Sequence, residues 1–91
     1  MLDIQLTSSF GHDLRLLKKR GMPLEKLEAV VNLLATGEPL PEKYKAHRLS
    51  GQWNGAWECH VAPDWLLIYK INERALILLL SRTGIHADLF R

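Results

Sequence analysis

Three strand-like runs in the C-terminal half constrain the fold of this chain more than any other feature. They cover residues 57–61, 65–70 and 74–82 and are rich in the branched and aromatic side chains that strands favour. Tight turns at 62–63 and 72–73 separate the runs, so neighbouring strands should pair antiparallel. The pattern predicts a three-stranded meander.

The N-terminal part predicts one strand and a helical hairpin. Leu2, Ile4 and Leu6 alternate with polar residues, which is the two-residue period of a half-buried strand. Apolar residues then recur at helical spacing over 9–20 and again over 23–35, and a glycine follows each segment. Two short consecutive helices of this kind pack as an antiparallel pair.

Length and composition limit the chain to one domain. It has 91 residues, of which 47% are hydrophobic and 24% charged, so it resembles an ordinary globular domain but is too short for a second core. We expect a single α+β domain over 1–91: an N-terminal strand, a helical hairpin, an antiparallel three-strand meander and a short C-terminal helical turn.

The predicted location is the cytoplasm. A single cysteine, Cys59, cannot form an internal disulfide, so nothing indicates an oxidising compartment. The longest apolar run, 75–80, is far shorter than the roughly 20 residues that span a bilayer. We therefore expect no membrane association.

The turns of the meander predict where its side chains meet. A turn centred on 62–63 places His60 opposite Trp65 on one face, because directly paired residues share a face. A turn centred on 72–73 places Leu80 opposite Trp65 and brings Arg82 beside Asp64. The end of the last strand therefore meets the first turn, and the C-terminal tail reaches the same rim.

Four residues near that rim are candidates for acid-base chemistry, because imidazole both takes and gives a proton near neutral pH. His60 and Asp64 flank the first turn, His86 lies in the tail, and His47 lies in a polar loop over 38–54 that could fold over the rim. Structural alternatives stay open: Asp64 could cap an Asx turn after proline, and His47 could be a solvated loop residue.

Metal and nucleophile chemistry have less support. The chain has no His-x-x-x-His spacing and no cysteine pair, and Cys59 should point to the opposite face from His60. No strained elbow sequence surrounds a serine. We expect neither a metal nor another cofactor.

Aromatic and basic residues near the rim are what unstacked RNA bases and phosphates require. Trp65 and Phe90 are the aromatic candidates, and Lys45, Arg48 and Arg82 supply positive charge. The competing interpretation is a core role for the aromatic rings and a solvated surface for the cations. The formal charge of +2 and the pI of about 8.9 permit an anionic partner without requiring one.

These residues belong to three motifs that together resemble a known family, the RelE superfamily of toxin-antitoxin mRNA interferases, and are most similar to its YafQ branch. The motifs are Leu40-Pro41-x-x-Tyr44-Lys45-x-His47-x-Leu49-x-Gly51-x-Trp53-x-Gly55, His60-Val61-x-Pro63-Asp64-Trp65-Leu66-Leu67-Ile68-Tyr69-Lys70 and Arg82-Thr83-Gly84-x-His86-Ala87-x-Leu89-Phe90. They cover about the C-terminal half, whereas the N-terminal half matches in pattern only.

The resemblance implies a sheet packed by two N-terminal helices, and an enzyme that cuts mRNA in the ribosomal A site. It also implies a cognate antitoxin, acidic in character, that wraps and silences the toxin. The implied site comprises His47, His60, Asp64 and His86. Trp65 and Phe90 would shape the pocket around the base.

The implied chemistry needs no metal, because RNA carries its own nucleophile in the 2'-hydroxyl. Asp64 with His60 would form the base side and His86 the acid, although His60 and His86 could exchange roles. His47 with Arg48 and Arg82 would stabilise charge. The products would be a 2',3'-cyclic phosphate and a 5'-hydroxyl.

One position departs from the family pattern. Related sequences often carry arginine on the strand before the histidine, where this chain has Trp57, which cannot neutralise a phosphate. Either Arg48 or Arg82 takes over that contact, or activity is weaker. A binding toxin of the same fold that inhibits gyrase, and an inert relative, are the alternative functions; the first lacks the histidine set.

Overall fold

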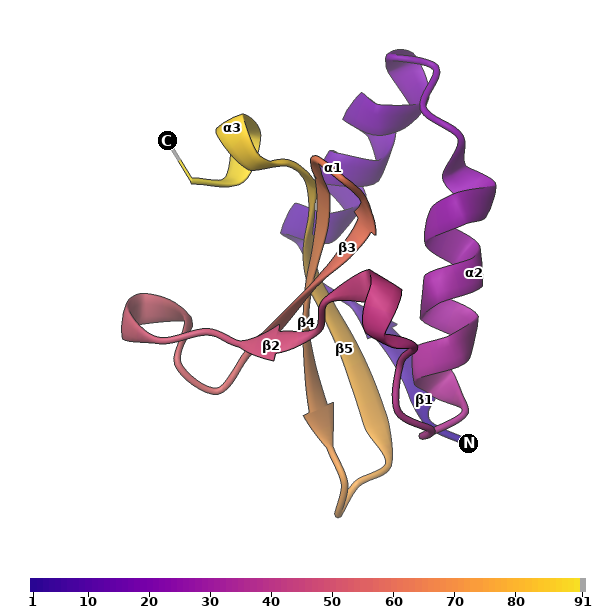
Figure 1. The fold of residues 1–91 in the computed structure, drawn as a ribbon, viewed down its shortest axis with the longest axis vertical. Coiled ribbons are helices and arrows are strands. Elements are labelled where there is room, and N and C mark those ends of the chain that lie inside the picture. The colour runs from indigo at the N-terminus through magenta and orange to yellow at the C-terminus, as the bar shows by residue number, and fades with distance from the viewer. Residues whose placement is uncertain (91) are drawn as a thin grey trace.

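The protein folds as a five-stranded sheet with two helices against one face (Figure 1). The computed structural model describes residues 1–90. The elements in chain order are β1 (Asp3–Leu6), α1 (Ser8–Lys19), α2 (Leu24–Ala35), the 3-10 turn η1 (Glu42–Tyr44), β2 (His47–Arg48), the 3-10 turn η2 (Gly51–Trp53), β3 (Trp57–Ala62), β4 (Trp65–Asn72), β5 (Ile77–Ile85) and α3 (His86–Leu89). This architecture confirms the predicted α+β fold class.

The strand order is β1-β5-β4-β3-β2. Strands β2 to β5 pair antiparallel, whereas β1 pairs parallel with β5, from Asp3 opposite Ile77 to Leu6 opposite Leu80. The long connection from β1 to β5 makes this possible, because parallel strands need a crossover. The meander is confirmed, but the sequence did not indicate which strand would receive β1.

The two helices form as the periodicity predicts, and they bury one face of the sheet. The Thr7 hydroxyl accepts a 3.0 Å hydrogen bond from the Phe10 amide and caps α1. Phe10 and Leu17 of α1, five residues of α2 and the inward side chains of β3 to β5 make one core cluster. β2 is the edge strand beside β3, and η2 and α3 lie on the side of the sheet away from α2 (Figure 1).

The predicted register within the meander is wrong. A bulge at Val61 and a turn at Pro63-Asp64 place His60 opposite Leu66, and Trp65 opposite Ala62. The shift of one residue turns Trp65 away from the face of His60 and towards the helices, because side chains alternate along a strand.

The second connection is also longer than predicted. The Asn72 side chain accepts hydrogen bonds from the amides of Arg74 and Ala75, at 3.1 and 3.0 Å, and shapes a loop over 73–76. This loop and a bulge in β5 bring Ile85, rather than Leu80, opposite Trp65. The broader prediction holds, because the last strand still ends beside the first turn.

The segment predicted as a loop contains structure that the sequence pattern concealed. It holds η1, η2 and the two-residue strand β2, in which His47 pairs with Glu58 and Arg48 with Trp57. So short a strand has no detectable period. Separately, no helix within residues 1–90 is long and apolar enough to cross a membrane.

An ion pair links α1 to the upper part of β5. The Arg82 guanidinium donates to both carboxylate oxygens of Asp13, at 2.7 and 3.1 Å, and the Thr83 amide donates to the same carboxylate at 3.0 Å. The hydrogen bonds to Asp13 raise the pKa of Arg82 above its ordinary value. Asp13 therefore anchors the strand that leads into the C-terminal tail.

We predict that Asp13→Ala lowers the free energy of unfolding by about 2–4 kcal/mol, because it leaves a partly buried guanidinium and an amide without their acceptor. Urea denaturation followed by circular dichroism measures the loss. Arg20→Ala is the matched control, because the Arg20–Asp88 pair is more exposed and should cost less than about 1 kcal/mol. Equal losses in the two variants would contradict the anchoring role.

Cys59 provides a second prediction. Its side chain is fully buried, and burial, helped by the nearby charge of Glu58, raises the pKa of the thiol from 9.0 to about 12. In the unfolded chain the thiol ionises at its ordinary pKa, so the unfolded state loses its proton first. Stability contributed by this group is therefore complete below about pH 9 and is lost as the pH rises towards 12.

We expect the thiol to react with a disulfide reagent at pH 8 only at the rate of unfolding, and one thiol to react at once in urea. Absorbance of the released thiolate measures both rates. A Cys59→Ala variant should lack the thiol's share of the stability loss above pH 9. Rapid reaction of the folded protein would show that Cys59 is accessible.

Candidate active site

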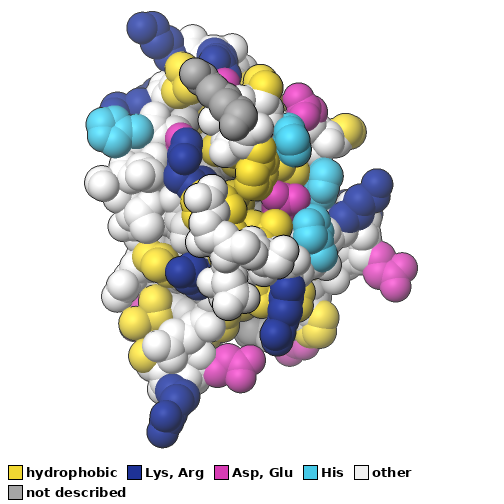
Figure 2. Space-filling view, turned by 90° about the vertical axis from the view of Figure 1, so that its left-hand side faces the viewer, with side chains coloured by type: hydrophobic (Ala, Val, Ile, Leu, Met, Phe, Trp, Pro, Cys, Tyr) yellow, Lys and Arg dark blue, Asp and Glu magenta, His cyan; other side chains and the backbone are white. Residues whose placement is uncertain are grey.

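Three histidines converge on the face of the sheet that the helices leave uncovered. His60 pairs with Leu66 on β4, and Leu66 pairs with Gly84 on β5. His47 pairs with Glu58, which lies two residues before His60 on β3, about 7 Å along the strand. Histidine side chains gather on one side of this face in Figure 2. The remaining histidine of the four in the sequence, His12, lies on α1 and contacts Arg15.

His47 is held by hydrogen-bond acceptors at both ring nitrogens. Its Nδ1 lies 2.9 Å from the Lys45 carbonyl oxygen, and its Nε2 lies 3.2 Å from Oε1 of Glu58. A carbonyl and a carboxylate can only accept, so both contacts are hydrogen bonds when the ring carries two protons. Both ring nitrogens of His47 therefore face acceptor oxygens.

The backbone at Lys45 is shaped for that contact. Lys45 has φ of 50° and ψ of 45°, the left-handed conformation that costs a residue with a side chain on the order of 1 kcal/mol. Its amide donates to the Glu42 carbonyl at 2.9 Å, which closes η1. The resulting bend directs the Lys45 carbonyl to the imidazole of His47.

His60 has one ring nitrogen engaged. Its Nδ1 lies 3.3 Å from the Pro63 carbonyl oxygen, an acceptor, so in the neutral ring the proton resides on Nδ1 and Nε2 keeps a lone pair. Asp64 follows Pro63 at the exposed tip of the turn and makes no hydrogen bond or ion pair to another residue within 1–90. Asp64 thus lies on the turn that His60 contacts through Pro63.

His86 reaches the same end of the sheet through β5. Ile85 pairs with Trp65 at the start of β4, and His86 follows Ile85 directly, so β5 delivers His86 to the end of the sheet where the Pro63–Asp64 turn lies. The His86 ring is exposed and contacts Phe90, with ring centroids 5.1 Å apart. The structure thus places His60, Asp64 and His86 towards one end of the sheet, with His47 on the neighbouring strand β2.

Contacts on both sides hold the helix α3 that begins at His86. Leu89 packs over Gly84, where a β-carbon would lie 3.5 Å from the leucine Cδ2. Asp88 accepts a 2.7 Å hydrogen bond from Arg20 at the end of α1. The position of His86 therefore depends on the helix layer as well as on the sheet.

Trp65 does not line the rim as predicted. Only 2% of its surface is exposed, and its ring nitrogen donates to the Thr83 hydroxyl at 2.9 Å in the core. No ring face is available for a base. Trp65 instead supports the turn from within the core. Phe90 is partly exposed beside His86 and remains a candidate for base contact.

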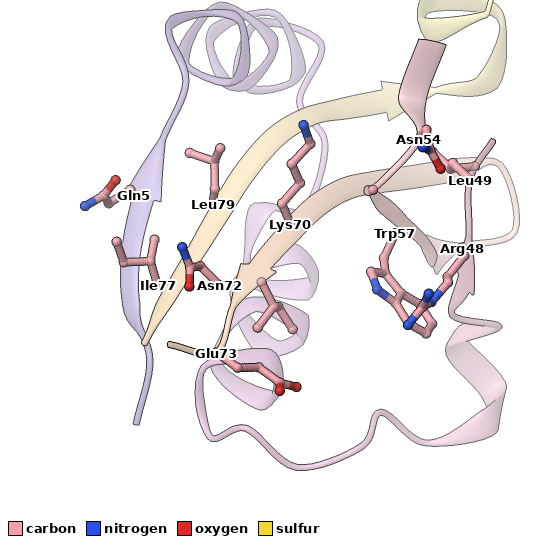
Figure 3. Close-up of a pocket in the computed structure, with 12 residues that line it drawn as sticks. Gln5, Arg48, Leu49, Asn54, Trp57, Lys70, Asn72, Glu73, Ile77 and Leu79 are labelled. Carbon is pink, nitrogen blue, oxygen red and sulfur yellow. The ribbon is translucent and has the colours of Figure 1, made fainter. Parts of the chain in front are cut away.

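The cations fall into separate groups. Arg82 is paired with Asp13, so its charge is balanced within the protein. Arg48 lies over the Trp57 ring, 5.3 Å from its centroid. Both line a groove of about 870 Å³ at the Lys70–Asn72 end of β4 (Figure 3). Arg48 and Trp57 form the strand pair directly next to His47–Glu58. Lys45 contacts His47 through its backbone carbonyl and lies two residues before it in the chain.

Glu58 is the site residue that the sequence reasoning did not select. It is 7% exposed, and its carboxylate pairs with His47. The sequence did indicate that Glu58 needs a partner, because it is a charged residue in an otherwise apolar strand. The partner could not be identified, because His47 lies in a strand too short to predict.

The described residues provide no metal site. Within 1–90, no group of three His, Cys, Asp or Glu side chains is placed to hold a metal ion. Both ring nitrogens of His47 and Nδ1 of His60 face oxygen acceptors, so these nitrogens act as donors in those hydrogen bonds. The arrangement fits proton transfer and charge stabilisation.

Comparisons with known proteins show the family of this chain. A family model described as the bacterial toxin of the type II toxin-antitoxin system, YafQ, matches residues 2–91. The mRNA interferase toxin YafQ of Escherichia coli strain K12 is 42% identical over 89 residues, which is 97% of this chain and 95% of the relative.

Solved structures show the same fold. YafQ from E. coli strain BL21(DE3) matches with a TM-score of 0.92 at 39% identity, and YafQ in the E. coli DinJ-YafQ complex with 0.90 at 40%, each covering 100% of both chains. A metal-bound toxin from Helicobacter pylori matches with 0.91 at 44%, covering 99% of this chain and 100% of that one. The chain belongs to the YafQ family of type II toxin-antitoxin toxins.

Proposed function

We propose that this protein is a metal-independent mRNA interferase that cleaves mRNA on the ribosome in the cytoplasm until an antitoxin neutralises it. The observation that supports it best is the set of ring contacts at the rim: His60 keeps a free Nε2, and His47 is held between two acceptors. The E. coli relatives, named mRNA interferases and solved with DinJ, support the same activity and partner class.

The proposed reaction moves two protons. His60, with Asp64 beside it, takes the proton of the 2'-hydroxyl through Nε2, and the 2'-oxygen attacks the adjacent phosphorus. The bond from phosphorus to the 5'-oxygen breaks, and protonated His86 donates a proton to that oxygen. The products are a 2',3'-cyclic phosphate and a 5'-hydroxyl end.

His47 and Glu58 are proposed to stabilise the negative charge that develops around phosphorus. A cationic His47 stabilises the dianionic phosphorane, and Glu58 keeps the cation in place before the substrate arrives. Phe90 is the proposed contact for the base. Lys45 is the nearest cation for the phosphate, and Arg48 is placed to hold RNA further from the rim.

We predict that His86→Ala lowers the single-turnover rate of mRNA cleavage on programmed ribosomes by about 100-fold or more, because it removes the general acid. The exposed position of His86 makes a folding defect avoidable. His12→Ala is the matched control, because His12 lies on α1 and should leave the rate unchanged. Cleavage by His86→Ala at the parent rate would remove His86 from the mechanism.

The same assay separates the alternatives. Cleavage should persist in EDTA, and mapped 5' ends should carry a hydroxyl group. A gyrase inhibitor of this fold would instead block DNA supercoiling and leave mRNA intact. An inert relative would arrest neither translation nor growth.

We also predict that Glu58→Gln lowers the cleavage rate about tenfold, because the amide keeps the shape and the acceptor oxygen but loses the charge that favours cationic His47. Cleavage rates measured at saturating and at limiting toxin separate the chemical step from substrate binding. The loss should appear in the cleavage rate at saturating toxin. An effect on the concentration dependence alone would assign Glu58 to substrate binding.

A further inference from the structure

A second groove, lined by lysines, opens beside His60. It has a volume of about 530 Å³ and lies between α2, η1 and the end of β3. Lys26 comes from α2, Lys43 and Lys45 from η1 and its C-cap, and His60 from β3. Residues from three separate parts of the sequence therefore build one wall of positive charge.

The groove is suited to a polyanion. All three lysines are exposed, and no aspartate or glutamate lies among the residues that line the groove. The Lys43 ammonium is positioned over the Tyr44 ring, 5.0 Å from its centroid, and the backbone bend at Lys45 fixes where the third lysine begins. The groove beside β4 is less positive, because Glu73 joins Arg48 and Lys70 in its lining.

The lysine groove is continuous with the proposed chemistry. Pro63, whose carbonyl oxygen contacts Nδ1 of His60, also lines the groove. An RNA strand with its scissile phosphate at His60 must place its neighbouring phosphates on one side or the other of that ring. On one side of the ring, the groove would surround those phosphates with lysine side chains.

We propose that the lysine groove binds the backbone of the substrate mRNA on one side of the scissile phosphate, with Lys26 and Lys43 contacting flanking phosphates. The proposal rests on the proposed function. An acidic protein segment is the competing ligand, because Ala29, Tyr44, Val61, Ala62 and Pro63 give the groove an apolar floor as well. The three exposed lysines and the contact of Pro63 with His60 favour an RNA backbone that continues from the proposed site.

The test uses a Lys26→Gln, Lys43→Gln double variant in single-turnover cleavage on programmed ribosomes. We expect the toxin concentration for half-maximal rate to rise about tenfold, while the saturated rate stays within about twofold. The slope of log affinity against log salt should fall by about one per lysine removed. Lys→Arg changes at both positions keep the charge and should restore binding.

Arg74→Gln is the matched control, because Arg74 lies at the tip of the β4–β5 hairpin, outside both grooves (Figure 1). A second arm uses mRNAs shortened from the 5' or the 3' side of the cleaved codon. The defect of the double variant should disappear on the mRNA that lacks the nucleotides held by the groove. A defect that is independent of mRNA length, or confined to the saturated rate, overturns the proposal.

A binding experiment separates this proposal from the proposed function. An mRNA with a 2'-deoxy nucleotide at the cleavage position cannot be cut, so toxin binding to its ribosome complex is measured without catalysis. If the parent protein cuts no mRNA, the proposed function fails, and the binding difference between parent and double variant still decides the groove. Equal binding of mRNA, with weaker binding of the antitoxin alone, assigns the groove to the protein partner and overturns the RNA proposal.

Discussion

The pairing of β5 with both β1 and β4 is the interaction on which the rest of the structure depends. β5 is the longest strand, and it joins the N-terminal segment to the meander. It also carries the chain to the rim, where Ile85 meets Trp65 and His86 follows. β1 pairs with β5 only as far as Leu80. Beyond that point, Asp13 of α1 binds Arg82 and Thr83 and holds β5 in place of a neighbouring strand.

Packing of the helices on only one face gives the site its setting. The core face takes Cys59, Trp65 and Leu67, which leaves the alternate residues Glu58 and His60 for the other face. That face is covered by short, irregular segments instead of helices (Figure 1). Polar side chains can therefore remain hydrated there, and imidazoles can exchange protons with a substrate.

Strong local patterns made much of the fold predictable from the sequence. Helical spacing identified α1 and α2, and alternation with turn residues identified the meander. Register was not predictable, because the bulge at Val61 and the side-chain cap of Asn72 each depend on contacts that no period reveals. The rim residues could be selected from motifs, whereas the partnership of Glu58 with His47 required the position of β2.

Lys45 shows why the site and the lysine groove form one unit. Its left-handed backbone is stabilised at both ends, because its amide bonds to Glu42 and its carbonyl accepts from His47. Glycine would adopt this conformation without strain, but it would remove one positive charge from the groove. A lysine here lets a single residue orient the imidazole through its backbone and present charge to RNA through its side chain. In the proposed mechanism, catalysis and substrate positioning therefore share the same turn of η1.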